Sequence, residues 1–186
     1  MHPYQPQAVA RGEFDGRLDA VVRVGAWYFA LDGRQNRLAR APVSAPGALQ
    51  PLDPVAHGSG RAASLAALAD QYLLATTPRC VRAFRVGADG GLTPAWTLEG
   101  DFGGDLYVAV SGRHLAVTDG TRHRLVLFAW AAALDVPPER IAQYGETDQP
   151  GNDYAHPDSP TLVSLCGIRA VVYDSGNQRV VKLVLR

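Results

Sequence analysis

A short pattern that recurs along the chain constrains its fold more than any other feature of the sequence. Each copy is an apolar run ending in Asp or Thr, followed by four turn-forming residues and then by Arg. The four copies span Tyr28–Arg37, Leu73–Arg82, Leu115–Arg124 and Ala170–Arg179. The marked Asp or Thr positions are 45, 42 and 55 residues apart, close to the period of four-stranded propeller blades. The repeat therefore predicts an all-β protein, a β-propeller of about four blades.

Each copy predicts two strands joined by a turn, because runs rich in Val, Leu, Ala, Tyr and Phe flank Gly, Ser, Asn or Pro. An apolar segment before each pair predicts an innermost strand, and the first three pairs are followed by an outer strand. The predicted blades of the single domain, residues 1–186, cover residues 18–55, 62–99, 106–145 and 161–186. The fourth blade lacks an outer strand, whereas residues 7–12 resemble an outer strand without a blade. We therefore expect this N-terminal strand to pair with blade four and close the propeller.

Two alternatives accompany this interpretation. The segment Ala62–Ala69 is rich in alanine and has a high propensity for helix, although its place in the repeat favours an innermost strand. Four blades also allow two assemblies, which are a compact closed ring and a part of a larger propeller that another chain completes. The sequence does not choose between these assemblies.

The last copy resembles a known repeat family. It reads Asp174-Ser-Gly-Asn-Gln-Arg-Val180 after an apolar strand, which is similar to the signature of NHL-repeat β-propellers. Weaker copies begin at Asp32 and Asp119, and the copy at Thr77 departs from the signature because it has neither the Asp nor the Gly. The resemblance implies a propeller that uses its loop face, in a family with metal-dependent lyases and lactonase-like relatives. NHL propellers usually have about six blades, whereas this chain supplies four.

The repeated Asp and Arg residues are interpreted as structural. An Asp at the end of a strand can accept hydrogen bonds from turn amides, and an Arg five residues later can face it across the hairpin. Residues that recur once in every blade are expected to hold the blades together. Residues that occur once are therefore the better candidates for function.

The candidate ligand-binding residues lie in the connections between blades and in the turns between second and third strands, which converge on one face of a propeller. The longest connection is Gly145–Asp158, and long loops in compact domains are often functional. Residues His57 and His156 are expected to face each other across the axis. The full candidate set is His57, His123, His156, Asp101, Asp105, Asp153, Arg34, Arg79 and Arg122.

Composition limits the partners. The chain has 18 basic and 18 acidic residues, a net charge of zero and a pI near 7.0, which disfavours nucleic acid or membrane binding through bulk charge. The first residues lack a secretory signal and no apolar run is long enough to span a membrane, so we expect a soluble, cytoplasmic protein. The two cysteines, Cys80 and Cys166, are expected to be buried thiols.

Two function classes follow. The favoured one is a binding module that presents its loop face to a protein, a peptide or a small polar ligand, without a cofactor. The alternative is a propeller enzyme, a metal-dependent lyase or lactonase-like hydrolase, with an axial His and Asp site and a divalent metal. The sequence does not indicate which residues would be catalytic or would bind a metal. It is compatible with a homo-oligomer. The fold does not decide between the classes, because one propeller scaffold hosts both.

Overall fold

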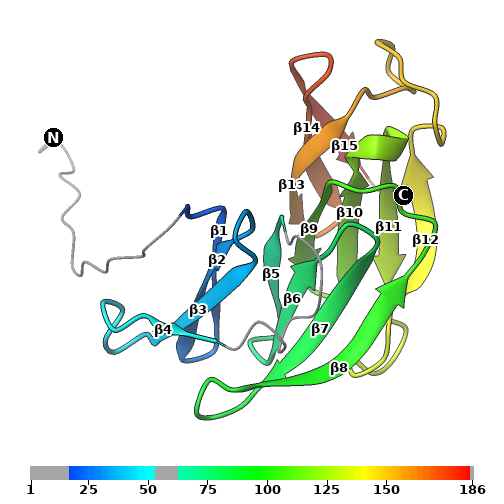
Figure 1. The fold of residues 1–186 in the computed structure, drawn as a ribbon. Coiled ribbons are helices and arrows are strands. Elements are labelled where there is room, and N and C mark those ends of the chain that lie inside the picture. Colours follow the sequence, from blue (N-terminus) through cyan, green and yellow to red (C-terminus); the bar gives the residue numbers. More distant parts are fainter. Residues whose placement is uncertain (1–16, 53–62, 185–186) are drawn as a thin grey trace, which may run out of the picture.

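The computed structural model describes residues 17–52 and 63–184, which form four antiparallel sheets. In each sheet every strand pairs with the next strand along the chain, so each sheet is a meander. Figure 1 shows the sheets following one another in chain order, with their first strands, β1, β5, β9 and β13, on the inner side. This is the four-bladed propeller arrangement that the repeat predicts.

The strands have the following bounds. Blade 1 consists of β1 Ala20–Val24, β2 Trp27–Asp32, β3 Arg37–Pro42 and β4 Gln50–Pro51. Blade 2 consists of β5 Leu65–Leu68, β6 Tyr72–Thr76, β7 Cys80–Val86 and β8 Leu92–Glu99. Blade 3 consists of β9 Leu106–Ser111, β10 His114–Asp119, β11 Arg124–Ala129 and β12 Glu139–Tyr144, with a 3-10 turn, η2 Gly120–Arg122. Blade 4 consists of β13 Pro160–Cys166, β14 Arg169–Asp174 and β15 Arg179–Val184.

The turn between the first two strands of each blade lies on the side opposite the predicted ligand face. In blades 1, 3 and 4 it begins with Gly25, Gly112 or Gly167, whose φ angles are 55°, 57° and 56°. Such a positive φ is open to glycine without steric cost and suits the tight turn of a hairpin. Blade 2 instead places Ala69 and Asp70 at positive φ. The hairpins of blades 1, 3 and 4 therefore share a two-residue turn, whereas in blade 2 three residues separate Leu68 from its partner Tyr72.

The turn between the second and third strands confirms the repeat in three blades and corrects it in one. Asp32, Asp119 and Asp174 lie opposite the Arg five residues later in the antiparallel register. In blade 2, the N–H of Thr77 donates to the carbonyl of Cys80 over 2.8 Å, so only two residues form the turn. Arg82 then pairs with Ala75 rather than with Thr77. The four-residue turn predicted for this copy is wrong, because the Thr77 hydroxyl accepts the Cys80 N–H and closes a tighter turn.

The core lies between the blades. Side chains alternate along each strand, so one face of a sheet packs on the preceding blade and the other on the following blade. Phe29, Leu31 and Leu38 of blade 1 pack against Leu65 and Leu73 of blade 2. Corresponding apolar clusters join blade 2 to blade 3 and blade 3 to blade 4. The blades are thus held together mainly by burial of apolar surface between successive sheets.

Other expectations have mixed outcomes. The alanine-rich segment contains a strand, β5, rather than a helix. Within the described residues, the short β4 represents the expected outer strand of blade 1. The closing strand predicted at residues 7–12 lies outside the described residues. Cys80 is buried, but Cys166 is exposed, so the prediction of a buried thiol is wrong there. Cys166 lies on the face of blade 4 that points away from blade 3.

Candidate functional site

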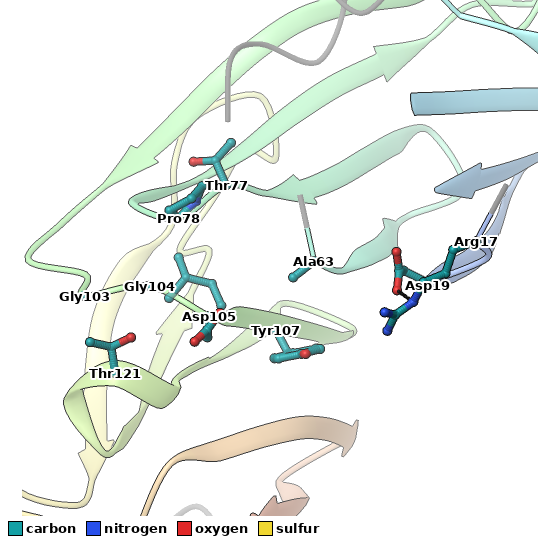
Figure 2. Close-up of a pocket in the computed structure, with 11 residues that line it drawn as sticks. Arg17, Asp19, Ala63, Thr77, Pro78, Gly103, Gly104, Asp105, Tyr107 and Thr121 are labelled. Carbon is teal, nitrogen blue, oxygen red and sulfur yellow. Dashed lines mark ion pairs between the residues drawn. The ribbon is translucent and has the colours of Figure 1, made fainter. Parts of the chain in front are cut away.

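A polar hollow of about 330 Å³ lies among the inner strands on the side of the turns between second and third strands. Its walls come from the segments that precede β1, β5 and β9 and from the turns that follow β6 and β10. Figure 2 shows Arg17 and Asp19 at one side of this hollow, and Thr77, Asp105, Tyr107 and Thr121 around the remainder. We call it the first hollow. It lies on the face that the sequence predicts to bind a ligand.

The buried Asp at the end of β10 holds one wall of the first hollow in place. The carboxylate of Asp119 is fully buried and accepts the N–H of Gly103, with both oxygens at 3.2 Å. This bond fixes the loop before β9, where Gly104 has a φ of 137° and Asp105 a φ of 52°. A positive φ is uncommon for Asp and turns the backbone sharply. Asp105 is thereby presented at the hollow, where its side chain is exposed to solvent.

In blade 1, a buried Asp likewise accepts backbone N–H groups and holds the opposite wall of the first hollow. The buried carboxylate of Asp32 accepts the N–H groups of Gln35 and Arg17, each over 3.0 Å. The Gln35 N–H, followed by that of Arg17, holds the pKa of Asp32 below its usual value. The guanidinium of Arg17 in turn forms an ion pair of 2.7 Å with Asp19. The cation of this wall is therefore already engaged by a neighbouring carboxylate.

A second hollow of about 580 Å³ continues from the first toward blade 4. The two hollows share Asp105, Tyr107 and Thr121, all of which belong to blade 3 or its preceding loop. The additional lining residues are Gly120, His123, Ser159, Thr161 and Ser175. Hydroxyl groups, two carboxylates, a guanidinium and an imidazole thus form one continuous polar trough along the inner edge of blades 1 to 4.

His123 is held in a defined orientation beside the second hollow. It ends the η2 turn in the left-handed region, with a φ of 54°. Its Nδ1 accepts the backbone N–H of Ser159 over 3.1 Å, and Asp158 Oδ1 lies at the same distance from Nδ1. Contacts with Ser159 and Asp158 therefore hold the imidazole ring from its Nδ1 side.

The long connection between β12 and β13 is anchored to blade 4. Arg179 donates to the carbonyls of Asn152 and Asp153 over 2.7 and 2.6 Å, and also to the carboxylate of Asp174 over 2.7 Å. In the same loop, His156 Nδ1 lies 2.8 Å from Asp153 Oδ2. His156 and Asp153, both candidate residues, are therefore in contact within one loop, and neither residue lines the two hollows.

The His156–Asp153 contact predicts a pH-dependent loop. Its hydrogen bond with Asp153 raises the pKa of His156, and the same bond lowers the pKa of Asp153. The contribution of His156 to stability is complete below its ordinary value of 6.5 and is lost as the pH rises through its raised pKa. The contribution of Asp153 is present above its ordinary value of 3.8 and is lost as the pH falls through its lowered pKa. The loop is therefore most stable between the two pKa values.

An NMR titration of the His156 ring checks this prediction. We expect a midpoint above 6.5 in the wild type. In Asp153→Asn the midpoint should fall, because the carboxylate acceptor is lost. Glu146 also raises the pKa of His156 but as a smaller cause, so Glu146→Gln serves as the matched control with a smaller shift. An unchanged midpoint in Asp153→Asn would show that the contact does not exist in solution.

The structure places the other candidates as follows. Asp105 and His123 line the trough, whereas Asp101 forms an ion pair with Arg122 outside both hollows. Arg34 and Arg79 are exposed in their turns. His57 lies outside the described residues, so its predicted position opposite His156 stays a prediction. Within the described residues, no group of three His, Cys, Asp or Glu side chains is placed to hold a metal ion.

Most of the lining residues lie outside the predicted candidate set. Arg17, Asp19, Thr77, Tyr107 and Thr121 line the first hollow but were not among the candidates. The signal that could have found them is the repeat register itself. Each of them lies near the start of an innermost strand or next to the turn between the second and third strands, where the loop face meets the axis.

Four consecutive meander sheets, joined by apolar faces and with a polar trough at their inner edge, define the chain as a β-propeller protein. Solved structures of the same class match it. They include an auxiliary nutrient binding protein from Bacteroides ovatus, with a TM-score of 0.69 and 12% identity over 93% of this chain. The periplasmic gluconolactonase of Pseudomonas aeruginosa matches with a TM-score of 0.64 and 19% identity over 91% of this chain. The β-propeller domain of Cps50 (Swd1) from Myceliophthora thermophila matches with a TM-score of 0.61 and 15% identity over 91% of this chain.

The chain spans about half the length of these structures, 46%, 50% and 54% respectively. No family model and no curated protein matches the chain. At these identities, the likeness establishes the fold alone. In the described part of the chain, no helix is long and apolar enough to cross a membrane.

Proposed function

We propose that the protein is a binding module that takes a small, uncharged, hydroxyl-rich ligand in the trough on its loop face. The observation that carries this proposal is the polar lining that the two hollows share at Asp105, Tyr107 and Thr121. Carboxylate oxygens accept hydrogen bonds from ligand hydroxyls, and the hydroxyls of Tyr and Thr both donate and accept. A carbohydrate-like molecule presents the matching groups.

The charge of the first hollow favours a neutral ligand over an anion. Asp19 and Asp105 bring two carboxylates, whereas Arg17 brings one guanidinium that is already paired with Asp19. Among the described residues, no ion pair engages Asp105, so an anionic ligand would face its carboxylate, which costs binding energy. Hydrogen bonds from neutral hydroxyls to the same carboxylate are charge-assisted and favourable.

Of the possible ligands, which are a protein, a peptide or a small polar molecule, the size of the hollows favours the small polar molecule. A volume of about 330 Å³ is at the lower end of the range of small-molecule sites. The nutrient binding protein among the matched structures carries a binding function on the same fold, which agrees with a binding role here. We also propose, from the resemblance of Asp174–Val180 to NHL repeats, that the propeller is of the NHL-repeat type. The alternative, a metal-dependent lyase or lactonase-like hydrolase with an axial His and Asp site, stays a prediction.

Isothermal titration calorimetry with D-glucose, D-galactose, D-mannose and D-gluconate tests the proposal. We expect at least one neutral hexose to bind and D-gluconate to bind more weakly, because of the carboxylates in the hollow. Asp105→Ala should weaken hexose binding by roughly 10- to 100-fold, the effect of losing a hydrogen bond to a charged group.

The matched control is Asp101→Ala. Asp101 is an exposed carboxylate of the same loop, but it pairs with Arg122 outside both hollows. This variant should bind the hexose as the wild type does. Stronger binding of D-gluconate than of every hexose, or equal hexose affinity in both variants, would contradict the proposed ligand class and site.

A further inference from the structure

Blade 4 presents an apolar face that the described chain leaves uncovered. Along β14, Ala170 and Val172 point toward blade 3 and are fully buried, whereas the alternate residues Val171 and Tyr173 point the other way. Leu162 of β13 and Val180 of β15 are on the same outward face. We call Leu162, Val171, Tyr173 and Val180 the end face of blade 4.

The repeat register shows that this face is built as a contact between blades. Val171 occupies the position of Phe29, Leu74 and Ala116, which all point to the following blade and are fully buried. Val180 likewise occupies the position of Leu38, Val81 and Leu125, whose exposure is at most 1%. Val180 itself is 68% exposed and Val171 is 41% exposed. Within the described residues, no further blade covers these side chains, whereas a following blade buries their counterparts in blades 1 to 3.

Blade 1 carries the complementary face at the other end of the series. The positions that pack on a preceding blade in blades 2 to 4 are occupied in blade 1 by Val21, Tyr28, Ala30, Ala39 and Ala41. Val21 is 55% exposed, whereas its counterpart Val108 in blade 3 is buried by blade 2. Strand β1 contacts β5, β5 contacts β9 and β9 contacts β13, but within the described residues β13 makes no comparable contact with β1. The three alanines of this face are themselves buried, at 4%, 7% and 0% exposure, so Val21 and Tyr28 carry the surface that a partner would contact.

We propose that the end face of blade 4 docks onto blade 1 of a second copy of this chain, so that two chains complete one propeller ring. A head-to-tail contact closes into a ring when its rotation is a simple fraction of a full turn. The matched propellers are about twice as long as this chain, so four blades correspond to about half of a ring. Two copies give eight blades, within the range that propellers adopt.

The contact that already joins the blades of one chain defines the geometry of the new one. In the interface between blades 2 and 3, the hydroxyl of Ser64 accepts the N–H of Val108 over 3.3 Å. By register, Leu162 corresponds to Ser64 and Val21 corresponds to Val108. Leu162 of one copy is therefore expected next to Val21 of the other.

A disulfide cross-link tests this placement. The variant Val21→Cys/Leu162→Cys, in a Cys166→Ser background, should form a covalent dimer on oxidation, as seen on a non-reducing gel. Each single-cysteine variant should stay uncross-linked. A monomer with an internal disulfide would overturn the proposal, because it would show that blade 4 docks onto blade 1 of the same chain. Absence of any cross-link would overturn it as well.

Analytical ultracentrifugation of the 186-residue chain provides the second arm. We expect a dimer for the wild type and a monomer for Val180→Asp, because a charge would be buried in the interface. Ile141→Asp is the matched control, since Ile141 is also exposed but lies on β12, away from the end face. It should stay dimeric. A monomeric wild type would refute the two-chain ring while leaving the ligand site, which one chain lines by itself, to be judged by calorimetry.

Discussion

Replacing Arg124 by Ala is expected to destabilise the protein by about 3 to 5 kcal/mol, the usual effect of removing one partner from a buried ion pair. The Arg124 side chain is 6% exposed and lies 3.3 Å from Asp119, which is fully buried. Arg124 also donates to Thr147 Oγ1 over 2.9 Å and to the carbonyl of Asp101. One guanidinium thus ties the loop before β9 and the loop after β12 to the end of β10. Chemical denaturation measures the change in the free energy of unfolding.

Two arginines serve as comparisons for this variant. Arg179 occupies the same register position in blade 4, but its side chain is 29% exposed, so Arg179→Ala should cost less, about 1 to 3 kcal/mol. Arg34 is exposed in the turn of blade 1, and Arg34→Ala should change stability by no more than about 0.5 kcal/mol. If Arg124→Ala were as stable as Arg34→Ala, the repeated Asp and Arg pairs would not hold the blades together.

The replacement Trp130→Ala should also cost about 3 to 5 kcal/mol, because it removes a large buried side chain between two blades. Trp130 follows β11 of blade 3 and is 3% exposed. Its ring lies 5.9 Å from that of Trp96 in blade 2, measured between centroids. Its indole N–H donates to the carbonyl of Val136 over 3.0 Å. The loss therefore combines apolar burial, an aromatic contact and a satisfied hydrogen bond.

The conservative variant Trp130→Phe separates these contributions. It keeps an aromatic ring against Trp96 but loses the hydrogen bond to Val136, so thermal denaturation should show a smaller loss of stability than for Trp130→Ala. Equal melting temperatures for the wild type and Trp130→Ala would contradict the assignment of this residue to the core between blades 2 and 3.

The fold could be predicted from the sequence because the repeat combines two kinds of signal. Alternating apolar residues specify strands, and the Asp and Arg at fixed positions specify the turn, so the blade boundaries follow. The exception at Thr77 arises because a hydroxyl and Pro78 permit a shorter turn, which changes the register by two residues. Register depends on the geometry of the turn as well as on the apolar pattern, and the repeat pattern alone did not give the length of this turn.

The site was predicted less well, for a physical reason. Histidines and charged residues that occur once are the predicted candidates, but several of these side chains already have partners nearby in the fold. His156 contacts Asp153, and Arg122 contacts Asp101. The residues that line the trough, such as Tyr107 and Thr121, are ordinary strand and turn residues. They become a site only because successive blades bring them together at the inner edge.

Ligands should bind on the face where the turns between second and third strands meet the axis. NMR chemical-shift mapping with the hexose that binds most tightly tests it most directly. We expect perturbed amides at Asp105, Tyr107, Thr121 and His123, and unperturbed amides at Gly112 and Gly167 in the turns of the opposite side. Perturbations confined to those opposite turns, or to the end face of blade 4, would contradict this prediction.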